Sequence, residues 1–64
     1  MKIKYDKETD VIYIQLSNSP IVESDEEKPG VILDFDADGG IVGIEVLNAT
    51  SRVDQVNSVI YEFA

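Results

Sequence analysis

The sequence predicts a small α+β domain, in which a hairpin-rich antiparallel β-sheet of four to five strands carries a C-terminal helix packed on one face. Three observations lead to this prediction. Polar and apolar residues alternate near the N-terminus, turn-forming residues interrupt the chain at short intervals, and the apolar spacing changes to three and four residues after Leu47. With 64 residues, the chain is predicted to form a single domain over residues 1–64.

Two strands are expected near the N-terminus. Residues 2–6 alternate polar and apolar side chains, with Ile3 and Tyr5 on one side, and this period of two is typical of a half-buried strand. Residues 11–16 are nearly apolar throughout and follow a short polar turn. A Ser-Asn-Ser-Pro run that ends at Pro20 closes this second strand.

Three further segments are predicted to extend the sheet. Residues 21–27 form a short edge strand, whose acidic end discourages edge-to-edge association. A Lys-Pro-Gly turn separates it from a strand at residues 31–36. An Ala-Asp-Gly-Gly turn then leads to a strand at residues 41–47, because Asp-Gly supplies the positive φ that tight hairpin turns need.

The register of this last hairpin follows from its apolar residues. A slip by one residue would turn aspartates toward the core, so the pairing is expected to be well specified. Asp34 and Asp36 then lie on the outer face, with Gly43 directly opposite Asp34. The predicted apolar pairs are Phe35 with Val42, Leu33 with Ile44, and Val31 with Val46.

A C-terminal helix is expected from about residue 51. Apolar side chains recur at helical spacing, and Ser51 with Asp54 resembles an N-capping arrangement. The alternative is a nearly all-β fold with a fifth, C-terminal strand at residues 59–63, which have strand-forming composition. The helical positions are Val53, Val56, Ile60 and Phe63.

Residues 34–45 satisfy the pattern of an EF-hand calcium loop, D-x-D-x-D-G followed by five residues and a Glu. An EF-hand needs a helix on each side, and Pro29 with Gly30 excludes the entering helix. The β-branched residues that follow the loop favour a strand. The pattern therefore favours a hairpin with an acidic turn, and a weak Ca²⁺ site is kept as an alternative. Its ligands would be Asp34, Asp36, Asp38 and Glu45.

The composition disfavours several classes of function. The chain has no Cys and no His, so it lacks the commonest nucleophile–base pairs and transition-metal ligands. We therefore expect no enzymatic activity and no cofactor. A net charge of −8 disfavours direct nucleic-acid binding. No apolar run has the length of a membrane span and no signal peptide is visible, so we expect no membrane association and a cytoplasmic location.

Apolar residues on the outer face of the sheet are candidates for partner binding. They lie among charged residues, and they mark an interface if their strands are adjacent. Ordinary two-sided packing is the alternative explanation. The candidates are Val11, Tyr13, Ile32 and Ile41. Arg52, the only arginine, is expected to make a local structural pair with the carboxylate of Glu45 or Asp54 after the last strand, and a carboxylate of a partner is the alternative.

Several segments of the chain together resemble a known family. They are Tyr5-Asp6, Ile12-Tyr13-Ile14, the run from Pro29 to Asp36, the run from Val42 to Leu47, and Asn48-Ala49 followed by Ser51-Arg52. This combination is similar to the small bacterial proteins grouped as domain-of-unknown-function family 2283, over roughly residues 1–53. The resemblance implies a compact β-sheet domain without established activity. Some relatives resemble the antitoxin half of two-protein modules, which implies an acidic, partner-binding protein.

Two functions are therefore expected from the sequence. The first is a small acidic protein-binding module, an antitoxin-like partner of a small toxin, which binds another protein or a second copy of itself. The second is a domain that binds a divalent cation weakly through the hairpin from Asp34 to Glu45.

Overall fold

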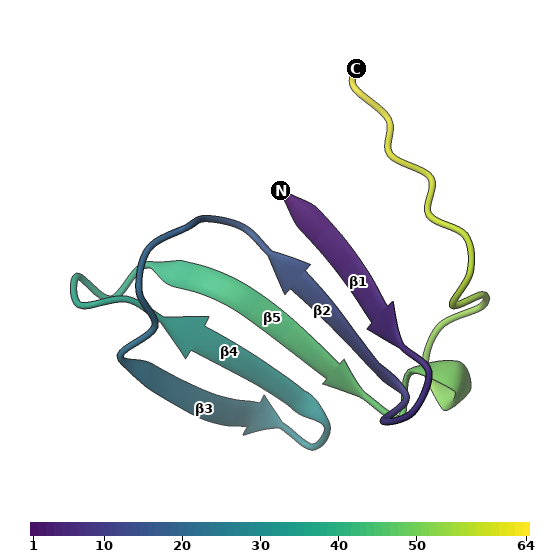
Figure 1. Cartoon of the computed structure of the whole chain (residues 1–64), viewed down its shortest axis with the longest axis horizontal. Helices are drawn as coiled ribbons and strands as arrows, with labels where there is room; N and C mark the ends of the chain where they lie inside the picture. The colour runs from purple at the N-terminus through teal and green to yellow at the C-terminus, as the bar shows by residue number, and fades with distance from the viewer.

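The computed structural model describes all residues, 1–64, as one antiparallel five-stranded sheet followed by a short 3₁₀ turn and an extended tail (Figure 1). The order of strands across the sheet is β1-β2-β5-β4-β3. The two edges are therefore β1 and β3. The elements are β1 (Lys2–Asp6), β2 (Val11–Gln15), β3 (Glu23–Lys28), β4 (Val31–Phe35), β5 (Ile41–Leu47) and the 3₁₀ turn η1 (Ala49–Ser51).

The predicted C-terminal helix is wrong, and so is the alternative C-terminal strand. After η1, residues 52–64 form neither a helix nor a strand, and the fold is all-β. The fifth strand of the sheet is instead the edge strand β3. The hydroxyl of Ser51 does not cap a helix, because it donates to the carbonyl of Asn48, 2.9 Å away. Val, Asn, Ser, Tyr and Phe also predominate in the tail, and these residues have modest helix propensity.

The predicted register of the β4–β5 hairpin is correct except at its end. Leu33 pairs with Ile44, Val31 with Val46, and Asp34 with Gly43. Phe35 pairs with Ile41 instead of Val42, because the register shifts between Asp34 and Phe35. This irregularity is a β-bulge that leaves Val42 as the extra residue, and bulges sharpen the local twist of a strand. Val42 is buried there, and its carbonyl accepts backbone hydrogen bonds from Leu16 and Ser17.

The pairing gives the sheet two chemically different faces. The apolar face carries Ile3, Tyr5, Ile12, Ile14, Val31, Leu33, Phe35, Ile44 and Val46, with the charged residues Glu23, Asp25 and Lys28 at its β3 edge. The polar face carries Lys2, Lys4, Val11, Tyr13, Gln15, Ser24, Glu26, Ile32, Asp34, Gly43, Glu45 and Leu47.

Burial on the two faces is the reverse of that in a complete hydrophobic core, where apolar side chains are the most deeply buried. No residue of the apolar face is fully buried; most are half-buried and Ile3 is exposed. The largest fully buried side chain of the chain is Asp34 on the polar face, at 2% exposure. The molecule measures only 19 Å along its shortest axis. A single-layer sheet therefore leaves its apolar face without the second layer that the missing helix was predicted to supply.

No helix of the structure is long and apolar enough to cross a membrane.

Candidate functional site

A cluster of polar side chains crosses four strands on the polar face. Ser24 of β3 donates to an Oδ of Asp34 over 2.6 Å. Asp34 pairs with Gly43, and Glu45 lies two residues further along β5. Tyr13 pairs with Glu45, and its ring lies over Gly43, where its Cζ would be 2.7 Å from a Cβ placed on that glycine. The glycine thus makes room for the tyrosine, and the tyrosine shields Asp34 from water.

The electrostatic environment of this cluster shifts the pKa of one of its two carboxyls, Glu45. Burial raises the pKa of Glu45 above its usual value, and a hydrogen bond to Asp34 and repulsion by its charge raise it further. Burial likewise raises the pKa of the Tyr13 hydroxyl, with Asp34 and Glu45 adding to the effect. No buried side-chain polar atom lacks a hydrogen-bond partner. The cluster is therefore satisfied from within the chain.

The four candidate calcium ligands separate into two places. Asp34 and Glu45 belong to the polar-face cluster described above. Asp36 lies in the hairpin turn, where one of its oxygens accepts from the backbone N–H groups of Asp38 and Gly40, at 2.9 and 2.8 Å. This is turn chemistry, in which an aspartate bonds to the backbone that follows it. No group of three or more carboxylates is placed so that it could hold a metal ion. The calcium alternative stays a prediction without support from a contact.

Three of the four candidate partner-binding residues share one face. Tyr13, Glu45 and Ile32 form one row across β2, β5 and β4 on the polar face, and Val11 lies on the same face of β2. Ile41 is at the start of β5, beside the bulge, and is 44% exposed. The structure thus brings Val11, Tyr13 and Ile32 together on a face that also carries the carboxyl cluster.

The edge strand β3 is the most acidic element of the chain. All six of its residues, Glu23–Lys28, are exposed, and four of them are Asp or Glu. It pairs with β4 on one side only, and a register shift interrupts it between Glu26 and Lys28. The sequence predicted this edge strand and its acidic end.

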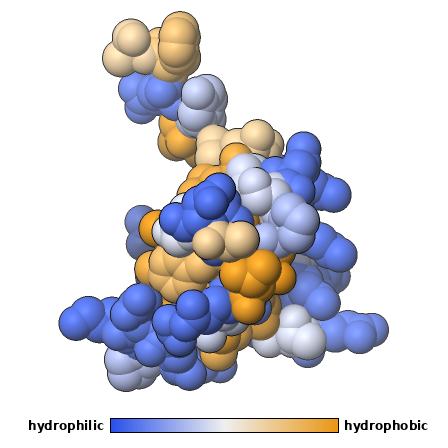
Figure 2. All heavy atoms as spheres, turned by 90° about the vertical axis from the view of Figure 1, so that its left-hand side faces the viewer, coloured by the Kyte–Doolittle hydropathy of each residue, from blue (hydrophilic) through white to orange (hydrophobic).

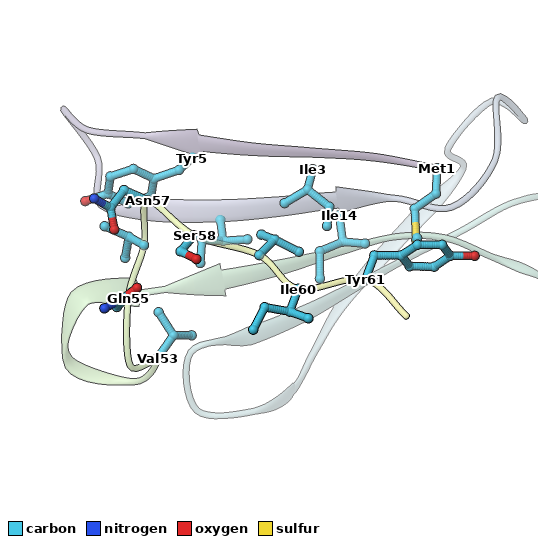
Figure 3. A pocket seen from close by; sticks show the side chains of 13 residues that line it. Met1, Ile3, Tyr5, Ile14, Val53, Gln55, Asn57, Ser58, Ile60 and Tyr61 are labelled. Carbon is cyan, nitrogen blue, oxygen red and sulfur yellow. The ribbon is translucent and has the colours of Figure 1, made fainter. Parts of the chain in front are cut away.

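The apolar face holds a groove that the sequence did not reveal. Ile3, Tyr5, Ile12 and Ile14 of β1 and β2 line it, and Val53 and residues 55–61 of the tail line its other side (Figure 3). In Figure 3 the side chains of Ile3 and Ile14 point toward the tail, and Tyr61 lies beside Met1. The apolar spacing of the tail predicts a helix on this face, whereas the structure has an extended segment whose half-buried Val53 and Val56 line the groove.

Arg52 fixes the start of the tail. Its guanidinium donates to the carbonyl of Pro29 over 2.7 Å and packs against Gly30, a residue with φ of 81°. Arg52 therefore has a local structural role as predicted, but the predicted carboxylate partner, Glu45 or Asp54, is wrong, because its partner is the backbone carbonyl of Pro29.

A comparison with protein-family models agrees with the family resemblance that the sequence segments predict. A model described as "Protein of unknown function (DUF2283)" matches residues 2–49. The chain belongs to this family. The matched residues of this DUF2283 chain comprise the whole sheet and end at the start of η1, so the tail lies outside them. No curated protein and no solved structure matches the chain.

Proposed function

We propose that this DUF2283 domain is a cytoplasmic protein-binding module that recognises a basic partner protein through its acidic edge, defined as Glu23, Asp25, Glu26 and Glu27 of β3. An antitoxin-like role, in which the partner is a small basic toxin, fits this chemistry. The proposal assigns the chain no catalytic reaction. The observation that carries it is an edge strand whose side chains are all exposed and mostly acidic.

Charge supports a basic partner over a neutral or acidic one. The chain carries 13 acidic and 5 basic residues. Such an excess speeds the encounter with oppositely charged proteins and repels nucleic acids. On the acidic edge the carboxylates stand close together on one strand, so their potentials add at a single place on the surface.

The polar face extends this surface toward the middle of the sheet. Glu26 pairs with Ile32, which pairs with Glu45 and then Tyr13, so acidic and apolar side chains alternate along one row. Interfaces commonly combine an aromatic anchor with a charged rim. The row therefore offers Tyr13 and Ile32 as the apolar contacts beside the acidic edge.

Co-expression with the products of the adjacent genes tests this function. The wild-type chain is expected to co-purify with a basic product, and the affinity should fall as the salt concentration rises, because salt screens the attraction between charges. The variant Glu23→Lys/Glu27→Lys should weaken binding at low salt by about tenfold or more, as reversal of charges in an interface does.

The matched control is Glu8→Lys/Asp38→Lys, which changes the net charge equally but at exposed positions outside β3 and outside the tail. It should weaken binding much less than the edge variant. Equal weakening by both variants would show that only net charge matters. If no adjacent product binds the wild-type chain, the proposed function is wrong.

A further inference from the structure

We propose that two copies of this chain pack together through their apolar faces, with residues 59–64 of each copy lying against the other copy. This pairing uses the apolar face, which borders the acidic edge at Glu23 and Asp25, and it does not depend on the function proposed above.

The first argument is the missing second layer. An antiparallel sheet ordinarily packs one face on a core, and a second sheet lies about 10 Å away. Here the row Ile14, Ile44 and Leu33 runs across the three central strands without a fully buried member. The tail lies beyond β1 in Figure 1, so it does not cover β4 and β5. The apolar face is therefore uncovered over β4 and β5.

The second argument is the area. The chain exposes 4977 Å², whereas a compact monomer of its 7.1 kDa would expose about 4,100 Å². The excess, about 900 Å², is close to the roughly 800 Å² that each partner contributes to a standard interface. Pairing of two copies would thus bring the exposed surface per chain to the value expected for its size.

The third argument is the tail itself. Its large hydrophobic side chains are 63% to 90% exposed, and the tail stands away from the body of the molecule (Figure 2). These side chains are Val59, Ile60, Tyr61 and Phe63. One chain thus presents both an open apolar face and an apolar segment that its own sheet leaves exposed. A two-fold axis places each segment on the other copy's face, so that both surfaces are covered at once.

Charge placement favours a second copy over a basic partner on this face. The centre of the apolar face carries no charged residue, and its charged neighbours, Glu23, Asp25 and Lys28, lie only at the β3 rim. An uncharged centre with a polar rim is the usual anatomy of an interface. Since both copies carry a charge of −8, salt should strengthen their association by screening repulsion. A basic partner would show the opposite dependence.

Sedimentation equilibrium of the full chain tests the pairing. At micromolar to millimolar concentration the mass is expected to rise from 7.1 kDa to twice that value, and added salt should lower the dissociation constant. The variant Ile60→Asp/Phe63→Asp changes residues that are exposed in the single chain, so the sheet should fold normally. It should raise the dissociation constant at least about 30-fold, as loss of an apolar anchor does.

The matched control is Ile21→Asp/Val22→Asp, which places the same charges at exposed apolar residues of the β2–β3 loop. It should leave the dissociation constant nearly unchanged. In mixed-label samples, intermolecular NOEs should reach the methyl groups of Leu33 and Ile44. A chain that stays a 7.1 kDa monomer, a dimer that both variants weaken equally, or intermolecular NOEs confined to β1 would each overturn the pairing.

Discussion

At the scale of single residues, Gly43 determines how the side chains of the polar face are arranged. Without a side chain there, the ring of Tyr13 can lie across β5 and cover Asp34. The buried aspartate is then held by Ser24 and accompanied by Glu45, whose pKa is raised mainly by burial. One glycine thus explains why a carboxylate is more deeply buried than any residue of the apolar face.

Substitution of Gly43 should destabilise the fold, because the new side chain would clash with Tyr13. In Gly43→Ala the new Cβ would meet the Tyr13 ring, and the ring would have to move. We expect a loss of about 1–3 kcal/mol in the free energy of unfolding, which is the usual cost of overpacking. Urea denaturation measures it. In a Tyr13→Ala background the same change should cost little, and a cost that persists there would contradict the contact.

Neutralising Glu45 should stabilise the protein at neutral pH. Because its folded-state pKa is raised, the folded chain binds this proton more tightly than the unfolded chain does. The stability linked to Glu45 is thus highest below the unfolded pKa of about 4.5, and it is lost as the pH rises through the folded value. Glu45→Gln should gain no more than about 1 kcal/mol at pH 7, since water screens a partly exposed group.

Urea denaturation across the acidic pH range measures this difference. The gain of Glu45→Gln over the wild-type chain should vanish below the unfolded pKa. A gain that does not change with pH, or a loss at neutral pH, would show that ionised Glu45 is not under strain in the folded chain.

At the scale of elements, the strands were predictable and the tail was not. Alternation and turn residues located every strand, and the apolar pairs of β4 and β5 fixed their register. The bulge at Val42 has no local signal, because it depends on the loop that follows β2. The prediction of a helix in the tail was wrong for a similar reason. Its apolar spacing fits a helix, but spacing alone does not supply the hydrogen bonds or propensity that a helix needs.

The candidate site shows the same limit. The sequence placed Asp34 and Glu45 on one face and the acidic residues on an edge strand, as the structure shows. It gave no sign that Asp34 would be buried, because that depends on the reach of Tyr13 across a neighbouring strand. Contacts between strands that are distant in sequence determine side-chain environment, and a single sequence does not reveal them.

Asp10 joins the β1–β2 turn to the element that follows the sheet. Its carboxylate accepts from the Tyr5 hydroxyl at 2.8 Å, from the Thr50 hydroxyl at 2.7 Å and from the Thr50 backbone N–H at 3.1 Å. The bond from the Thr50 hydroxyl is the main contact that lowers the pKa of Asp10. Asp10 also has a φ of 56°, which Asn tolerates and Ala does not.

Removing this carboxylate should therefore loosen η1. In Asp10→Ala, hydrogen exchange at the Thr50 amide is expected to rise by about tenfold or more, because the local structure opens more often. Asp10→Asn keeps an acceptor and the left-handed backbone, so it should raise exchange much less. If both variants exchange alike, the side chain of Asp10 does not hold the turn.

At the scale of the whole molecule, the chain is a sheet with one layer and two uses for its surface. On the polar face, the polar side chains around Asp34 are satisfied by hydrogen bonds within the chain. The acidic edge remains exposed and can bind the basic partner proposed above. The apolar face is half-buried, and the tail that could cover it lies beyond β1 (Figure 1). The absence of a covering helix is the feature on which the inferred pairing of two copies depends.

Paramagnetic relaxation of methyl groups by a soluble agent tests most directly whether the apolar face of the single chain is uncovered. A soluble paramagnetic agent is added to the full chain at low and high protein concentration. The methyl groups of Leu33 and Ile44 should relax fast in the dilute sample and be protected in the concentrated one, whereas those of buried Val42 should be protected in both. Protection of Leu33 and Ile44 in the dilute monomer would contradict the account, because the chain would then cover its own apolar face.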